Sequence, residues 1–123
     1  MRLEAGGWYG WTMFPGYGDT AYHSPIKVRR VAPLRSGERL FDLDFFNMGY
    51  AQGVQDMRYR LRTLRGEPHY LVAACQDSDR SVAIMPLTRG WLRTHAPQLW
   101  KRASTMLLDG ASVRATMDAI SGA

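Results

Sequence analysis

The sequence has little cysteine and no long hydrophobic run. Cys75 is the only cysteine among 123 residues, so a disulfide within the chain is excluded. The longest uninterrupted apolar stretch, residues 70–75, is far shorter than the roughly 18 residues that span a bilayer. No apolar run of the kind found in export signals follows the first residues. These absences predict a cytoplasmic protein without a membrane partner, in which Cys75 is a small buried side chain.

Lysine is also scarce, and one long segment has no acidic residue. Arginine outnumbers lysine by 14 to two, and the net charge is +5. Up to Met57 six basic residues balance six acidic ones, whereas ten basic residues face five acidic ones from Arg58 onward. No acid lies between Asp79 and Asp109. A one-sided positive field attracts nucleic acid, an acidic protein surface or an anionic ligand. The arginine excess fits bidentate recognition of phosphate or carboxylate, and it fits a GC-rich genome equally well.

Motifs for metal binding, cofactor binding and catalysis are missing as well. The histidines His23, His69 and His95 lack the spacing that places two ligands on one face of a helix or strand. Ser24 follows His23 but has no glycine elbow around it, and neighbouring strand residues point to opposite faces. We therefore expect no metal and no cofactor, and a binding protein is favoured over an enzyme.

The length and composition predict a single compact domain over residues 1–123. Apolar residues make up 46% and charged residues 22% of the chain, as in ordinary globular proteins. Strand-like and helix-like segments follow one another, which predicts the α+β class. We expect an antiparallel or mixed sheet of about four to five strands, with helices packed on one face.

The clearest strand pattern lies in residues 38–46. Phe41, Leu43 and Phe45 alternate with Asp42 and Asp44, the period of two that is typical of a half-buried strand. The two aspartates on the outer face would suit a divalent cation or an acid–base pair. The structural interpretation is stronger, because Lys27 and Arg29 on a neighbouring strand are expected to pair with them.

Four other segments complete the predicted organisation. The glycine- and aromatic-rich residues 5–22 predict an N-terminal hairpin or a loose arm, and residues 69–87 predict a second hairpin. Residues 48–65 predict an amphipathic helix, since Val54, Met57, Leu61 and Leu64 recur at helical spacing before a Gly-Glu-Pro stop signal. Residues 88–121 predict C-terminal helices that begin near Thr88, Pro97 and Ser112.

Arginines and aromatics are the candidate partner-binding residues. On the helix predicted over 48–65, Arg58, Arg62 and Arg65 would form a ridge along one flank, able to follow phosphates or to remain solvated. Exposed tryptophan, tyrosine and arginine dominate binding surfaces, although such aromatics are more often core residues. The candidates are Arg58, Arg62, Arg65, Arg89, Arg93, Arg102, Trp8, Tyr9, Trp11 and Tyr17.

Three functional hypotheses follow from these patterns. The first is a non-enzymatic interaction module that binds a protein or ribonucleoprotein complex, such as the small inhibitors that mobile elements encode. The second is direct nucleic-acid binding through the arginines, which predicts a steep loss of affinity with salt. The third is a small transferase or hydrolase around His23, and it requires Asp42 or Glu67 to converge with that histidine in one pocket.

Overall fold

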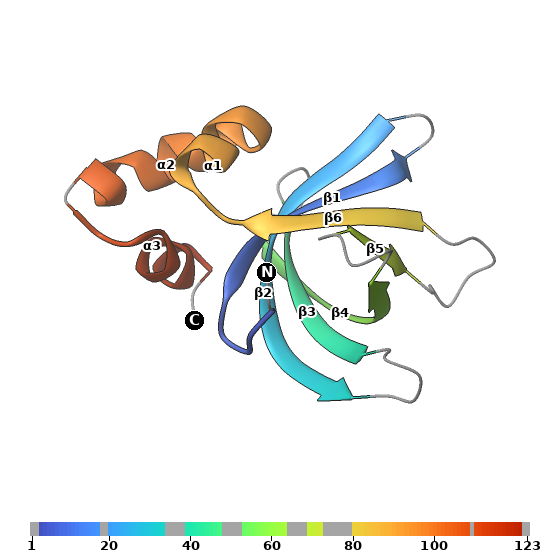
Figure 1. The fold of residues 1–123 in the computed structure, drawn as a ribbon. Coiled ribbons are helices and arrows are strands. Elements are labelled where there is room, and N and C mark those ends of the chain that lie inside the picture. Colours follow the sequence, from blue (N-terminus) through green and yellow to red (C-terminus); the bar gives the residue numbers. More distant parts are fainter. Residues whose placement is uncertain are drawn as a thin grey trace.

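The computed structural model describes residues 3–17, 20–33, 39–47, 53–63, 69–72, 80–108 and 110–121. Within these ranges a sheet comes first and helices follow (Figure 1). The described strands are β1 (Trp8–Tyr17), β2 (Thr20–Pro33), β3 (Arg39–Asn47), β4 (Gly53–Thr63), β5 (His69–Val72) and β6 (Arg80–Pro86). The described helices are α1 (Arg89–His95), α2 (Pro97–Leu108) and α3 (Val113–Ile120).

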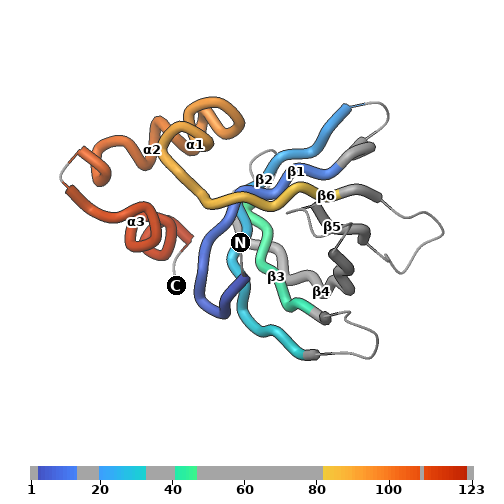
Figure 2. The backbone as a smooth tube through the Cα atoms, viewed as in Figure 1, coloured from blue at the N-terminus to red at the C-terminus, as the bar shows by residue number. Residues whose placement is uncertain are grey.

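The strands form a closed antiparallel barrel in which each strand pairs with its neighbours in chain order. β1 completes the closure by pairing with both β2 and β6, so that Trp11 lies opposite Ser24 on one side and Ile84 on the other. Figure 2 shows the curved backbones of β1, β2, β3 and β6, with the helices together at one side of these strands. The predicted α+β class with an antiparallel sheet is confirmed.

The barrel interior is filled by the inward side chains of the strands. The predicted alternation on β3 is confirmed, since Phe41, Leu43 and Phe45 are at most 3% exposed. The indole of Trp11 meets the ring of Phe45 edge-on, with 4.8 Å between their centroids. The other buried members of this core are Leu3, Ile26, Val28, Val82 and Ile84.

The three helices begin at the capping residues that the sequence predicts. Oγ1 of Thr88 accepts a hydrogen bond from the backbone N–H of Trp91, and Oγ of Ser112 accepts one from Ala115, both at 3.0 Å. Pro97 opens α2, where its missing N–H costs nothing. None of the helices in the described ranges has the length and the apolar composition that crossing a bilayer requires.

A second core joins the helices to the outer surface of the barrel. Trp8 of β1 and Phe46 of β3 supply the barrel side, and Trp91 and Leu92 of α1 lie against them in the same cluster. The indole of Trp91 packs directly on the backbone of Gly10, where a methyl group would come within 2.8 Å of its Cδ1 atom. β1 and β3 are therefore buried on both faces where the helices cover them.

The two predicted hairpins are confirmed. β1 pairs with β2 from Trp8 opposite Lys27 to Tyr17 opposite Thr20, so this segment is a hairpin and not a loose arm. β5 pairs with β6 in the second hairpin, with His69 opposite Ala83. Cys75 and the turn of the second hairpin lie outside the described residues.

The helix predicted over residues 48–65 is wrong. Gly53–Thr63 form β4, which pairs with β3 along its length and with β5 at its end. A period of two was also present in the sequence, because Met57, Tyr59 and Leu61 alternate with arginines at 58, 60 and 62. The apolar residues fit both helical spacing and the strand period of two. Hydrogen bonding to the flanking strands, a tertiary effect, selects the strand.

Candidate functional site

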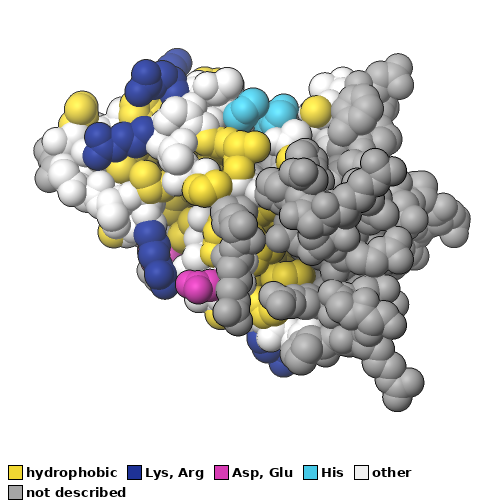
Figure 3. All heavy atoms as spheres, in the orientation of Figure 1, with side chains coloured by type: hydrophobic (Ala, Val, Ile, Leu, Met, Phe, Trp, Pro, Cys, Tyr) yellow, Lys and Arg dark blue, Asp and Glu magenta, His cyan; other side chains and the backbone are white. Residues whose placement is uncertain are grey.

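Four exposed cations lie on α1 and α2. Arg89, Arg93, Lys101 and Arg102 are all exposed, as the sequence analysis requires of partner-binding residues. No carboxylate in the described ranges pairs with any of the four. Figure 3 shows lysine and arginine side chains gathered over this helical end of the molecule.

The arginines of α1 lie along the flank of α2. The guanidinium carbon of Arg93 is 5.2 Å from the ring centroid of Trp100, within the range of a cation–π contact. One turn earlier, Nη2 of Arg89 donates a hydrogen bond to the carbonyl oxygen of Leu107 at 3.4 Å. Both contacts hold the guanidinium groups of these arginines against α2, and both residues remain exposed.

Helical geometry divides the remaining cations between two flanks. Each residue turns about 100° round the axis of an α-helix, so Lys101 adjoins Trp100, whereas Arg102 lies about 200° beyond it. Leu108 follows Lys101 by seven residues and therefore shares its face, and it is 83% exposed. We call the surface made by Arg89, Arg93, Trp100, Lys101 and Leu108 the α1–α2 face. Arg102 does not belong to it.

The helical spacing on which the predicted arginine ridge of residues 58–65 depended is wrong, because β4 is extended. Residues two or four apart share one face of a strand, so Arg58 and Arg62 lie on the same face of β4. In the register Arg58 lies opposite Asp42, and Arg62 lies opposite Leu71. Arg65 and the side chains of the other two arginines lie outside the described part of the chain.

The predicted exposed aromatics are mostly withdrawn into the two cores. Trp11 is completely buried inside the barrel, and Trp8 is 7% exposed beneath the helices. Tyr9 is half-buried, and its hydroxyl accepts a hydrogen bond from the backbone N–H of Glu4 at 2.9 Å. The Tyr17 side chain lies outside the described residues. Neither Trp8 nor Trp11 can anchor a partner in this fold, because β1 is covered on both sides.

The two aspartates of β3 take part in ion pairs. Asp44 accepts from Nε of Arg29 at 3.2 Å, as the sequence analysis expects, and Asp42 accepts from Nε of Arg30 at the same distance. In the described ranges no three His, Cys, Asp or Glu side chains come together as metal ligands. The structural interpretation of these carboxylates is therefore favoured over a cation site.

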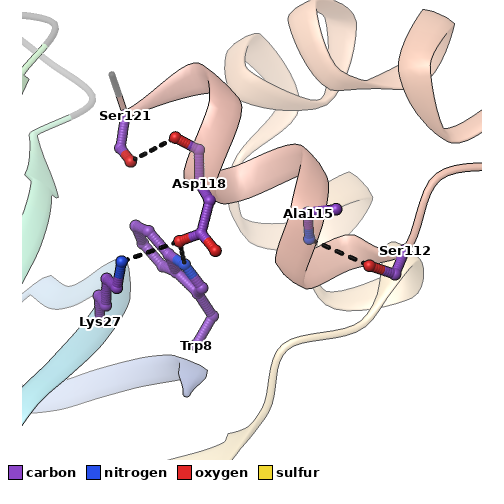
Figure 4. A network of polar contacts seen from close by, with 6 residues as sticks. All are labelled: Trp8, Lys27, Ser112, Ala115, Asp118 and Ser121. Carbon is purple, nitrogen blue, oxygen red and sulfur yellow. Dashed lines mark hydrogen bonds and ion pairs between the residues drawn. The ribbon is translucent and has the colours of Figure 1, made fainter. Parts of the chain in front are cut away.

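Lys27 pairs with Asp118 of α3 and not with the aspartates of β3. Oδ1 of Asp118 accepts hydrogen bonds from Nε1 of Trp8 at 2.8 Å and from Nζ of Lys27 at 2.9 Å (Figure 4). The hydrogen bond from Trp8, followed by that from Lys27, lowers the pKa of Asp118 below its ordinary value of 3.8. This carboxylate fastens α3 to the first two strands.

Removal of this carboxylate is expected to loosen α3. Asp118→Ala leaves the Trp8 N–H without its acceptor, and we expect the free energy of unfolding to fall by about 1–2 kcal/mol, the lower part of the range for charged hydrogen bonds in a partly exposed site. Asp118→Asn keeps an acceptor oxygen, so its free energy of unfolding should fall by less than that of Asp118→Ala. Because the folded pKa is lowered, the stabilisation is complete above pH 3.8 and is lost as the pH falls through the folded pKa.

Urea denaturation at pH 7 and at pH 3 measures both effects. Glu4→Ala is the matched control, since it removes an exposed carboxylate that forms no ion pair within the described ranges. Equal stabilities of Asp118→Ala and Glu4→Ala would contradict the proposed role of the carboxylate.

Two histidines meet where α1 approaches the barrel. The rings of His23 on β2 and His95 at the end of α1 are stacked, with 4.3 Å between centroids and 24° between planes. Nδ1 of His23 shares a hydrogen bond of 2.9 Å with the hydroxyl of Thr12 on β1. His95 also lines an open groove of about 470 Å³ beside Met85 and Trp91. Histidine side chains and hydrophobic atoms adjoin at this surface in Figure 3.

The catalytic pocket proposed around His23 is not supported. Asp42 lies opposite Arg30, seven residues along β2 from His23, which corresponds to about 23 Å of extended strand. Asp42 is moreover engaged with that arginine. Glu67 lies outside the described residues. His23 and Asp42 therefore do not converge, and a hydrolase or transferase built on that pair is excluded.

Sequence reasoning missed the partners of His23 and Asp118. Trp8 and Asp118 are 110 residues apart, and no local pattern links two residues at that distance. One weak signal was available, because Asp118 is the single acid of the predicted last helix.

The fold and the site together define an antiparallel six-stranded barrel, within the described residues, with helices on one outer side and a cationic surface on those helices. Comparison with protein-family models, with curated proteins and with solved structures finds no match for this chain.

Proposed function

We propose that the protein is a non-enzymatic interaction module whose α1–α2 face binds an acidic surface of a protein or ribonucleoprotein complex. The single cysteine supports a site of action in the cytoplasm, where thiols stay reduced. Occupation of such a surface would inhibit the larger complex, in the manner of the small inhibitors that mobile elements encode. The observation that carries the proposal is the presence, on one face, of an exposed leucine and of cations that pair with no carboxylate of the described ranges.

The cations supply attraction and orientation. Arg89, Arg93 and Lys101 present three positive charges on a part of the chain without an acidic residue, so their fields add. Arg93 is already held over the Trp100 ring, which reduces the side-chain entropy that binding would cost. Arginine and tryptophan are also the residues most enriched among those that dominate binding energy.

The exposed leucine favours a protein over a nucleic acid. Leu108 is 83% exposed, and its burial by a partner would remove apolar area from water. Phosphate oxygens offer nothing to such a side chain, whereas an acidic protein surface with apolar residues satisfies both parts of the face. The scarcity of lysine, a common phosphate contact, points in the same direction.

Synthetic polyanions test the proposal directly. Fluorescence anisotropy compares labelled poly-glutamate, a random glutamate–tyrosine copolymer, single-stranded DNA and RNA, and duplex DNA at about 50 and 200 mM salt, a range over which phosphate contacts weaken by orders of magnitude. We expect the copolymer to bind most tightly. Arg93→Ala with Lys101→Ala should weaken it about tenfold, since two exposed charge pairs contribute up to about 1 kcal/mol each.

Adjacent residues provide matched controls. Lys101→Ala and Arg102→Ala remove the same charge from consecutive positions of α2, and only the first should weaken copolymer binding. Leu108→Ser should weaken binding of the copolymer and leave poly-glutamate unchanged. Tighter binding of DNA or RNA than of the copolymer would contradict this proposal and support the nucleic-acid hypothesis. Equal effects of Lys101→Ala and Arg102→Ala would show that the α1–α2 face is not the binding surface.

A further inference from the structure

The stacked histidines connect the barrel with α1, two parts of the molecule that are far apart in the sequence. His23 belongs to the barrel, and His95 is the last residue of α1. Their rings are 4.3 Å apart, and the Trp91 ring, which packs on Gly10, lies 5.1 Å from that of His95. The contact between the imidazoles is therefore part of the interface that docks α1 on the barrel.

The surroundings of the pair offer no compensating negative charge among the described residues. From β1 the neighbouring group is the neutral Thr12 hydroxyl. From the end of β6, Met85 and Pro86 line the groove beside His95. The nearest cation of α1, Arg93, is directed to Trp100, and Lys27 of β2 is paired with Asp118. Each histidine thus has the other as its titratable neighbour.

Two stacked imidazoles tolerate one positive charge far better than two. The neutral rings attract as aromatic planes, whereas two imidazolium rings at this separation repel each other in a partly dehydrated site. Burial, and after it the charge of His95, lowers the pKa of His23 below its ordinary value of 6.5. The undocked state therefore binds more protons than the docked state below pH 6.5, so acidification favours undocking.

We infer that the His23–His95 stack is an acid-sensitive latch that holds α1 on the barrel at neutral pH and releases it as both rings become protonated. Release would uncover Trp91, which packs on Gly10 of β1. The inference concerns the docking of α1 and does not depend on the proposed binding function.

Hydrogen exchange of the α1 amides measures this docking. The amides of Leu92 and Ala96, which bond to the carbonyls of Thr88 and Leu92, report on the helix. In the native chain, after correction for intrinsic rates, we expect their protection to fall between pH 7 and pH 5 by up to about tenfold per unit for each proton taken up. The amides of Val28 and Leu43 in the barrel should change much less.

Two variants separate the contributions of the rings. His95→Phe keeps an aromatic ring on His23 and removes one charge, so the pH dependence should become smaller. His23→Gln combined with His95→Phe should remove it. Retention of the full pH dependence in the double variant, or equal loss of protection in α1 and in the barrel, would overturn the inference.

A titration of the native chain covers the case in which the double variant does not fold. NMR of the His23 Cε1 proton should show a titration with a midpoint below 6.5, together with a shift of the Trp91 indole signal. A His23 titration that is not lowered, without a change at Trp91, would overturn the latch.

Discussion

Replacement of Gly10 by alanine is expected to lower the free energy of unfolding by about 1–3 kcal/mol, the usual cost of an extra methyl group in a packed interior. The three atoms nearest to the added Cβ all belong to the Trp91 indole, so the methyl group forces that ring away from the barrel. Gly10 is buried, and the strand on which it lies is held by β2 and β6. The helix must therefore move, because the strand cannot.

A double-mutant cycle makes this prediction specific. Trp91→Ala removes a side chain that is 5% exposed, and it should cost about 3–5 kcal/mol as a large-to-small change in a core. In the Trp91→Ala background the methyl group of Gly10→Ala meets no indole ring, so Gly10→Ala should hardly change the free energy of unfolding. Denaturant unfolding of the four proteins gives the coupling energy. Additive costs would show that Gly10 and Trp91 do not meet as described.

Trp11→Ala is expected to destabilise the barrel by about 3–5 kcal/mol. The side chain is completely buried, and its removal leaves a cavity beside Phe45, which loses its edge-on aromatic contact. The strands pair around this core, so we expect cooperative loss of the whole barrel. Circular dichroism during thermal unfolding should show one transition, shifted to lower temperature.

A second tryptophan provides the matched control for Trp11. Trp100→Ala removes the same side chain from a half-buried position on α2, and its cost should be about 1 kcal/mol or less. The same variant removes the ring beneath Arg93, so it should weaken copolymer binding while leaving the barrel intact. A Trp11→Ala protein as stable as Trp100→Ala would contradict the barrel core described above.

Local patterns predicted the parts of the fold that local chemistry controls. Thr88, Pro97 and Ser112 determine helix starts through their own side chains, and those starts are where the sequence places them. The alternation of residues 41–45 likewise predicts both the strand and its inner face. Such signals require only neighbouring residues.

The candidate site was predicted in part. The exposed cations of α1 and α2 followed from the acid-free sequence between Asp79 and Asp109. The sequence favours Trp8 and Trp11 as partner-binding residues, yet both are buried, Trp11 in the barrel core and Trp8 beneath the helices. Nothing in the sequence of β1 indicates that Trp91 of α1, which is far away in the chain, packs on Gly10.

The sequence by itself determined the α+β class, the helix caps, the first and second hairpins and the positive charge of the last third of the chain. The tertiary structure alone decided that Gly53–Thr63 is a strand, since its apolar spacing suits either period and only hydrogen bonding to β3 and β5 selects one. It also decided the closure of the barrel, the Asp118 anchor and the stacking of His23 on His95. Each of these brings together residues far apart in the chain, and their energy exists only after the intervening strands have folded.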